Sequence, residues 1–216
     1  DKTTDWLEKW SNKTPEQVFL AERSGEGWQE VSYQSAAEQV SAIAAALLGL
    51  GLGKGTPILV LSGNSVRHGL LTLAAQMVGI PTVPIAEQYS LIPSAHGQLD
   101  YFVGLTRPAL VYAEDQARFS AALAHPAFDD LLKVVGKGGG PGFLSFDDLL
   151  AGDKGVDLVA SASEVGPDAV VKILTTSGST SAPKGVATTH RMMCANQAQV
   201  ADALPFLNMR PPVLMD

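Results

Sequence analysis

The sequence has few of the residues on which several classes of protein depend. Cys194 is the only cysteine in 216 residues, so neither an internal disulfide nor a cluster of thiolate metal ligands can form. Basic residues are outnumbered, with 15 Lys and Arg against 22 Asp and Glu and a net charge of −7. Binding to nucleic acid or to an anionic membrane needs clustered Lys and Arg, so we expect neither partner. No apolar run reaches the length that spans a bilayer.

The low cysteine content also indicates the cellular compartment in which the protein is located. A chain with one cysteine suits a reducing environment, and the opening stretch DKTTDWLEKW lacks the pattern of a secretory signal peptide. We therefore expect a cytoplasmic protein. Hydrophobic residues make up 46% and charged residues 17% of the chain, which predicts a folded domain with a substantial core. Cys194 has no charged neighbour that would clearly lower its pKa, so we interpret it as an inert thiol.

Strand-like and helix-like segments alternate along the chain. This spacing indicates right-handed crossovers, so the expected fold class is α/β, with a largely parallel sheet flanked by helices. The buried face of the first helix is expected to carry Val40, Ile43, Ala44 and Leu47. Strands are predicted at 18–23, 28–33, 56–62, 80–86, 109–113, 131–135 and 169–176, and helices at 34–50, 64–79, 115–124 and 146–151.

Single residues give sharper expectations within this pattern. Asn64 is expected to cap the helix that follows it. The prolines of IPTVPIA predict either an edge strand or a strand whose ends they mark. His190 directly follows a strand, and we interpret it as the start of a helix rather than as a catalytic residue. His68 and His96 lack metal-ligand spacing with any carboxylate, and His125 precedes Pro126 in an expected turn. No metal site is therefore predicted.

One glycine-rich stretch, GKGGGPG at 136–142, superficially suggests a phosphate-binding loop. It offers no hydroxyl donor, and Pro141 removes one backbone N–H. No helix begins directly after it to direct a dipole at an anion. We expect a surface loop without a ligand.

A second stretch, LTTSGSTSAPKGVATTH at 174–190, has the chemistry that the first one lacks. Small hydroxyl side chains can donate to phosphate oxygens, a glycine lets backbone N–H groups approach a ligand, and a lysine adds a full positive charge. Strand-like runs on both sides would hold the loop in place. The expected phosphate-binding residues are Thr176, Ser177, Gly178, Ser179, Thr180 and Lys184.

The spacing of this loop excludes a Walker A motif. That motif has glycine directly before the lysine and Ser or Thr directly after it, and it opens a helix. Here Pro183 precedes Lys184, Gly185 follows it, and the next residues are typical of a strand.

TSGSTSAPKG resembles the phosphate-binding signature of the adenylate-forming superfamily, which includes acyl-CoA synthetases, luciferases and peptide-synthetase adenylation domains. Ser181 stands where most members have glycine. WQEVSYQSAAEQVSAIAAALLGLGL and AAQMVGIPTVPIAEQYS are similar to two further regions of that superfamily, and the resemblance covers most of residues 18–203. LSGNSVRHGLLTLAAQMVGIPTVPIAEQYSL and THRMMCANQAQVADALPFLNMRPPVLMD most resemble the feruloyl-CoA synthetase subgroup.

The resemblance implies a two-step ligase reaction. A small-molecule carboxylic acid would react with Mg²⁺-ATP to give an acyl-adenylate and pyrophosphate, and coenzyme A would then displace AMP. The loop residues would hold the β- and γ-phosphates by electrostatic positioning. The acid expected from the closest subgroup is ferulate or a related hydroxycinnamate.

The resemblance also implies that this chain is the N-terminal portion of a larger AMP-binding domain. Its expected parts are a first α/β subdomain over about 1–150, a connection over 151–168, the strand–loop–strand unit over 169–190, and a helix with a truncated tail over 191–216. The catalytic residues would lie beyond the chain, so we expect none here. Without an adenine pocket, a few charge-assisted hydrogen bonds predict ATP binding in about the millimolar range at best, and no turnover.

Other interpretations stay open. The parent protein could instead be a CoA ligase for fatty or other aryl acids. A non-catalytic nucleotide-binding module and a domain that uses the hydroxyl-rich loop as a protein contact are two further alternatives. Apolar residues near the end of the chain could be exposed by truncation and cause self-association.

Overall fold

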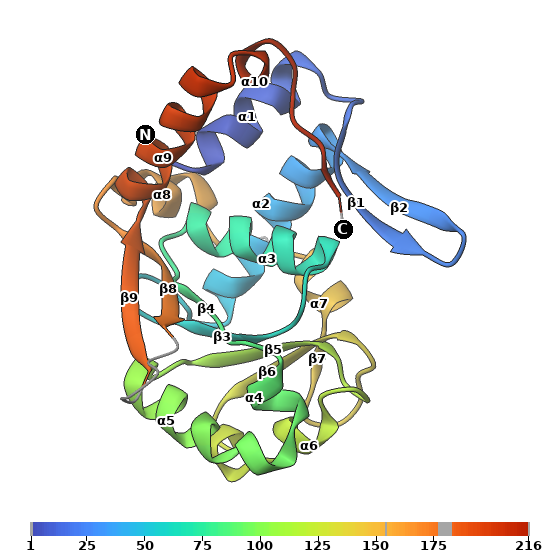
Figure 1. Cartoon of the computed structure of the whole chain (residues 1–216), viewed down its shortest axis with the longest axis vertical. Helices are drawn as coiled ribbons and strands as arrows, with labels where there is room; N and C mark the ends of the chain where they lie inside the picture. The colour runs from blue at the N-terminus through green and yellow to red at the C-terminus, as the bar shows by residue number, and fades with distance from the viewer. Residues whose placement is uncertain (1, 154, 177–182, 216) are drawn as a thin grey trace.

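The central feature of the computed structural model, which describes residues 2–153, 155–176 and 183–215, is a seven-stranded sheet (Figure 1). Its strand order is β7-β6-β5-β3-β4-β8-β9, and every neighbouring pair is parallel except β8 and β9. Helices flank this sheet, which confirms the α/β class. The strands are β3 (Ile58–Leu61), β4 (Thr82–Pro84), β5 (Leu110–Asp115), β6 (Leu132–Lys137), β7 (Leu144–Ser145), β8 (Val170–Thr176) and β9 (Lys184–Thr189).

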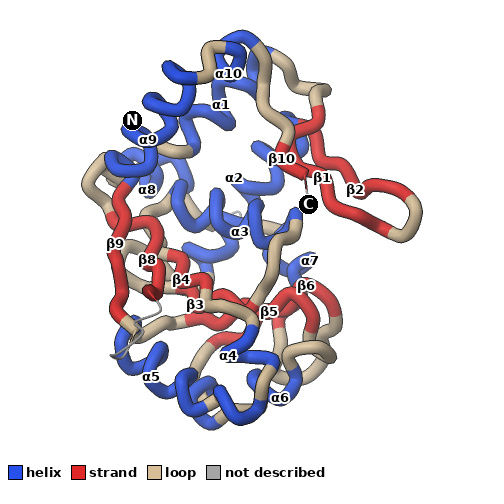
Figure 2. The backbone as a smooth tube through the Cα atoms, viewed as in Figure 1, coloured by secondary structure: helices blue, strands red, loops and turns tan. Residues whose placement is uncertain are grey.

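Two layers of helices cover the two faces of the sheet (Figure 2). Along β3, Ile58 and Val60 point into one core cluster, whereas Leu59 and Leu61 point into the other. A strand that is buried on both faces is apolar at every position, which explains the continuous run ILVL. One layer contains α2 (Tyr33–Gly49), α3 (Val66–Met77) and α7 (Phe146–Leu150); the other contains α4 (Gln88–Leu91), α5 (Gly97–Thr106) and α6 (Ser120–Leu123).

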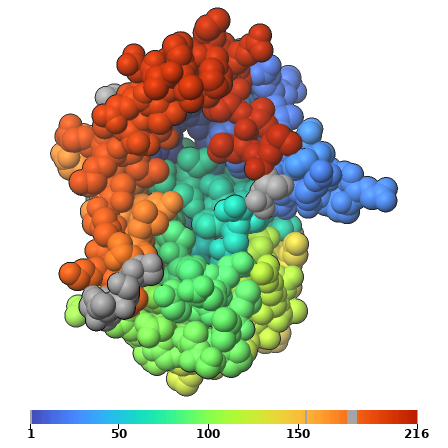
Figure 3. All heavy atoms as spheres, viewed as in Figure 1, coloured from blue at the N-terminus to red at the C-terminus, as the bar shows by residue number. Residues whose placement is uncertain are grey.

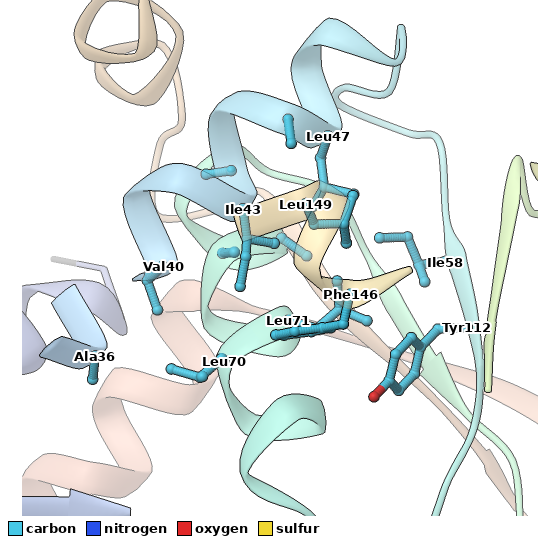
Figure 4. Packing of buried hydrophobic residues seen from close by; sticks show 14 of the residues in the cluster. Ala36, Val40, Ile43, Leu47, Ile58, Leu70, Leu71, Tyr112, Phe146 and Leu149 are labelled. Carbon is cyan, nitrogen blue, oxygen red and sulfur yellow. The ribbon is translucent and has the colours of Figure 1, made fainter. Parts of the chain in front are cut away.

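Helix α2 carries the buried face that its sequence predicts. Val40, Ile43, Ala44 and Leu47 are all fully buried, and Figure 4 shows this face beside side chains of α3 and α7. Burying a side chain of this size contributes about 1.5–3 kcal/mol to folding. The hydroxyl of Ser32 accepts a hydrogen bond from an N–H of the first turn and so fixes where the helix begins.

The N-terminal and C-terminal segments lie together at one end of the molecule (Figure 1). Strand β10 pairs in parallel with β1, and β1 forms the expected hairpin with β2. No helix in the described ranges is long and apolar enough to cross a membrane. The elements of this end are α1 (Thr4–Lys13), β1 (Val18–Ser24), β2 (Gly27–Ser32), α8 (Leu158–Ser163), α9 (His190–Ala203), α10 (Phe206–Met209) and β10 (Leu214–Met215); short 3-10 turns cover Pro93–Ala95 and Pro126–Phe128.

The structure corrects three local expectations. Ser65, not Asn64, caps α3, because its hydroxyl accepts from the N–H of His68 at 3.0 Å. Strand β4 lies between β3 and β8 in the sheet interior, so the edge-strand interpretation of IPTVPIA is wrong. Pro84 is the last residue of that strand, which agrees with the alternative that prolines mark its ends.

The third correction concerns the helix expected over 115–124. Only Ser120–Leu123 is helical there. Asp115 ends β5, and its carboxylate accepts from the backbone N–H of Arg118 at 3.0 Å. This side-chain hydrogen bond stabilises a turn over 116–119, where the sequence predicted helix.

Candidate functional site

The hydroxyl-rich stretch connects the two antiparallel strands at one edge of the sheet. Strand β8 runs into it and β9 runs out of it, and the register places Thr176 directly opposite Lys184. The Thr176 hydroxyl donates to the carbonyl oxygen of Lys184 at 3.4 Å. The two expected residues at the ends of the stretch are therefore neighbours. The other four, Ser177, Gly178, Ser179 and Thr180, lie outside the described residues.

The charge of Lys184 is available to a ligand. Its side chain is exposed at the first position of β9, and it takes part in no ion pair with any residue of the described ranges. A lysine that is not paired within the protein can neutralise a phosphate without first losing a partner. The hairpin places this cation beside the Thr176 hydroxyl, whose long hydrogen bond to the Lys184 carbonyl oxygen must open before that hydroxyl can donate to an oxyanion.

The opposite end of the hairpin is fixed by an ion pair. Arg191 donates hydrogen bonds to the two carboxylate oxygens of Asp168, at 2.7 and 2.8 Å. This contact holds the pKa of the Asp168 carboxyl below its usual range. Both side chains are exposed, so the pair fixes geometry more than it adds stability.

Helix α5 supports the hairpin where β9 begins. The Tyr101 hydroxyl donates to the carbonyl oxygen of Pro183, the residue directly before Lys184. One turn further along the same helix, Leu105 lies against Gly185: a Cβ atom at that glycine would come within 3.6 Å of Leu105 Cδ2. Sequence patterns did not reveal either contribution. The only available signal was the helical spacing of Leu99 and Phe102, which lie on the buried face of this helix.

A cavity in the described part of the chain lies away from the hairpin. It has a volume of about 740 Å³ and opens between the C-terminal segment, α1 and α3, where Figure 3 shows the surface hollowed. Its lining contains aromatic, aliphatic and neutral polar side chains but no Asp, Glu, Lys or Arg. A triphosphate needs positive charge, so this cavity does not suit a nucleotide.

Similarity to known proteins agrees with the geometry of the hairpin. A family model described as "AMP-binding enzyme" matches residues 7–214. The chain belongs to the AMP-binding enzyme family.

The names of two curated relatives of this AMP-binding chain mention different acids. 4-Coumarate–CoA ligase 2 of Oryza sativa subsp. japonica is 33% identical over 174 residues, which is 74% of this chain and 29% of that protein. Long-chain-fatty-acid–CoA ligase FadD15 of Mycobacterium bovis is 29% identical over 165 residues, which is 73% of this chain and 26% of that protein. The chain thus spans between a quarter and a third of the length of these relatives.

A solved structure shows the same fold. The fatty acyl-adenylate ligase of L. pneumophila, in complex with acyl adenylate and pyrophosphate, matches with a TM-score of 0.71 and 18% identity. The match covers 93% of this chain and 32% of that one. At this identity the likeness establishes the α/β architecture of the AMP-binding chain and nothing finer.

The glycine-rich stretch GKGGGPG at 136–142 does not form a comparable site. The backbone N–H of Gly139 donates to the side-chain oxygen of Gln116 at 2.7 Å, so this donor is already used. Lys137 is the last residue of β6 and is exposed. No hydroxyl residue stands within GKGGGPG to add a second donor.

His190 and Cys194 both lie in the first half of α9. No group of three or more His, Cys, Asp or Glu side chains in the described ranges could hold a metal ion. His190 is buried as the first residue of α9, which agrees with its interpretation as a structural residue. Burial raises the pKa of the Cys194 thiol, so little of the nucleophilic thiolate forms near neutral pH.

Proposed function

We propose that this chain is the phosphate-binding, N-terminal portion of an ATP-dependent acid–CoA ligase. The observation that carries the proposal is the β8–β9 hairpin, in which Lys184 and Thr176 face each other across the ends of a hydroxyl-rich stretch. Membership of the AMP-binding enzyme family supports it. Because the chain spans 26% and 29% of the two named ligases, we assign the complete reaction to a longer parent protein.

The reaction proposed for the parent has two steps. A carboxylate oxygen attacks the α-phosphorus of Mg²⁺-ATP, the bond to the β-phosphate bridging oxygen breaks, and pyrophosphate leaves. The thiol of coenzyme A then attacks the acyl carbon and displaces AMP. Lys184 and the Thr176 hydroxyl would neutralise and orient the β- and γ-phosphates, together with Ser177, Gly178, Ser179 and Thr180. The described residues offer no protein cage for a divalent ion, so Mg²⁺ would arrive bound to ATP.

Ferulate or a related hydroxycinnamate is the substrate that we propose for the parent. The similarity of two long stretches to feruloyl-CoA synthetases supports it, and a relative named as a 4-coumarate–CoA ligase is compatible with it. The alternative is a fatty acid or another aryl acid, which a relative named as a long-chain-fatty-acid–CoA ligase supports. A cytoplasmic location is part of the same proposal.

The 216-residue chain tests the proposal directly. ³¹P NMR titration should show ATP binding in about the millimolar range. Incubation with ATP, Mg²⁺, coenzyme A and ferulate should form no feruloyl-CoA by liquid chromatography. Failure to bind ATP would reject the phosphate site, and measurable feruloyl-CoA would reject the assignment of catalysis to the parent.

Sequencing the parent gene beyond residue 216 and assaying the parent protein distinguish a ligase from a non-catalytic nucleotide-binding module. A ligase parent should continue for about 300 or more residues, which is typical of the family that the sequence resembles and enough for two further domains of common size. It should also activate ferulate or palmitate in a pyrophosphate-exchange assay. A parent that binds ATP but activates neither acid would favour the non-catalytic module. In the parent, loss of ATP-induced protection of residues 174–186 from hydrogen exchange would favour a protein-contact role for the loop.

Self-association of the 216-residue chain is also proposed. The lining of the 740 Å³ cavity contains no Asp, Glu, Lys or Arg, so two copies can face each other there without charge repulsion. Val200, which is 41% exposed on α9, lines it. From α9 onward, the exposed large apolar residues are Met192, Val200, Leu204, Phe206, Met209, Val213, Leu214 and Met215.

Sedimentation velocity over a concentration series tests this association. Val200→Glu should weaken it, because the substitution places a carboxylate at the apolar surface. The matched control is Ile92→Glu, since Ile92 is 49% exposed but lies at the end of α4, in the other helix layer. A chain that stays monomeric, or equal effects of the two substitutions, would reject the proposed surface.

A further inference from the structure

Helix α5 contacts the backbone at the point where the hydroxyl-rich stretch meets β9. Tyr101 and Pro183 are separated by 82 residues in the sequence, yet the tyrosine hydroxyl donates a hydrogen bond to the proline carbonyl oxygen. Figure 1 shows α5 beside the end of β9 at which the strand begins. The contact therefore ties a helix of one layer to the edge of the sheet.

The Pro183 carbonyl lies directly before the first paired residue of β9. The paired register of β8 and β9 begins with Thr176 opposite Lys184, so Pro183 is the first residue outside the ladder. Proline has no N–H and cannot extend the ladder as a donor. The Tyr101 hydroxyl thus holds the backbone one residue beyond the point where strand pairing starts.

Helix α5 also limits the backbone on the other side of Lys184. A Cβ atom at Gly185 would come within 3.3 Å of Ile173 Cγ2 and 3.6 Å of Leu105 Cδ2, so β9 lies close to both side chains there. Tyr101 and Leu105 are four residues apart and project from one face of the helix. They contact the chain immediately before and immediately after Lys184.

The helix that carries these two residues is itself well anchored. Leu99 and Phe102 are fully buried in the second core cluster. The ring of Tyr101 packs edge-on against Phe102, with centroids 5.9 Å apart. A hydroxyl on such a support can define the position of a backbone carbonyl more tightly than a side chain on a loop could.

We infer that Tyr101 is a positioning residue for phosphate binding. Through its hydrogen bond to Pro183 it fixes the backbone from which the Lys184 side chain projects, so that the ammonium group is held ready for the triphosphate. The inference rests on the proposed function, and it adds to the site a residue 75 positions before Thr176 that the loop sequence does not contain.

The test compares two tyrosines that make the same kind of contact. Tyr101→Phe removes the hydroxyl from Pro183, and Tyr33→Phe removes a hydroxyl that donates to the carbonyl oxygen of Pro212 at 2.7 Å, far from the hairpin. The probe is inorganic tripolyphosphate, titrated into the 216-residue chain and followed by ³¹P NMR. Tyr101→Phe should raise the dissociation constant about two- to tenfold, the effect of losing one hydrogen bond, and Tyr33→Phe should leave it unchanged.

Thermal unfolding of both variants separates positioning from a general loss of stability. Each loses one hydrogen bond to a proline carbonyl, so similar decreases of the melting temperature are expected. A weaker affinity confined to Tyr101→Phe supports the inference. Equal affinities of Tyr101→Phe and the unsubstituted chain overturn it while the proposed function stands. Absence of tripolyphosphate binding by the unsubstituted chain overturns both.

Discussion

The imidazole Nε2 of His190 lies 3.0 Å from the backbone carbonyl oxygen of Gln76. Nδ1 of the same ring accepts a hydrogen bond from the backbone N–H of Thr3 at 3.2 Å. Because Nδ1 is the acceptor, the neutral ring carries its proton on Nε2 and donates it to Gln76. One buried histidine thereby connects the N-terminal segment, α3 and the start of α9.

This contact predicts a dependence of stability on pH. Burial is the main reason why the pKa of His190 lies below its usual value. Above about pH 6.5, the ordinary pKa of histidine, the ring is neutral in both the folded and the unfolded chain, and the contribution is complete. Below that pH the unfolded chain binds a proton that the folded chain resists, so the free energy of unfolding should fall as the pH decreases.

Urea denaturation between about pH 7.5 and 5.5, a range that brackets the ordinary histidine pKa, measures this effect. His190→Gln keeps a donor and an acceptor but does not titrate, so its free energy of unfolding should depend less on pH than that of the unsubstituted chain. Burial also lowers the pKa of His68, which leaves part of the dependence in the variant. An unchanged dependence in His190→Gln would contradict the role given to the ring.

Lys184 and Lys137 form a natural comparison. Both are exposed residues at strand ends beside glycine-rich stretches, but only Lys184 lies beside hydroxyl donors in the proposed site. Lys184→Ala should weaken ATP binding about tenfold or more, because a charge-assisted hydrogen bond contributes about 1.5–3 kcal/mol. Lys137→Ala should leave the ATP dissociation constant unchanged. ³¹P NMR titration gives both constants.

The salt dependence of ATP binding provides a second test of the contribution of the Lys184 charge. Exposed charges are screened by salt, so ATP binding to the unsubstituted chain should weaken as sodium chloride is increased. Lys184→Ala should show a smaller salt dependence, whereas Lys137→Ala should behave like the unsubstituted chain. Equal losses of affinity in the two variants would show that net charge, rather than the hairpin, determines binding.

Two glycines should respond in opposite directions to the same substitution. Gly104 lies in α5, and a Cβ atom added there would meet no atom of the described residues within 4 Å. Gly104→Ala should therefore stabilise the chain by about 0.5–1 kcal/mol through helix propensity. Gly136 lies in β6, where a Cβ atom would come within 2.7 Å of the Glu114 carbonyl oxygen and of the Tyr112 hydroxyl. Gly136→Ala should destabilise the chain by about 1–3 kcal/mol. Chemical denaturation measures both changes.

The parallel sheet and the helices α2 and α3 could be predicted from alternation and periodicity, whereas α5 was not among the predicted helices. The run ILVL at Ile58–Leu61 has no polar position because both of its faces are buried, and the apolar face of α2 has helical spacing. Strand order could not be predicted in the same way. Pro84 suggested an edge, but pairing of β4 with β3 and β8 placed that strand inside the sheet.

The position of the candidate phosphate site follows from the sequence, because its hydroxyl groups, its glycine and Lys184 are close together in the chain. Tertiary structure alone decided what supports that site. Tyr101 contacts Pro183 across 82 residues, and His190 meets Thr3 and Gln76 only after three segments have packed. Such contacts depend on how distant elements pack against one another, and no periodicity within a short stretch records that arrangement.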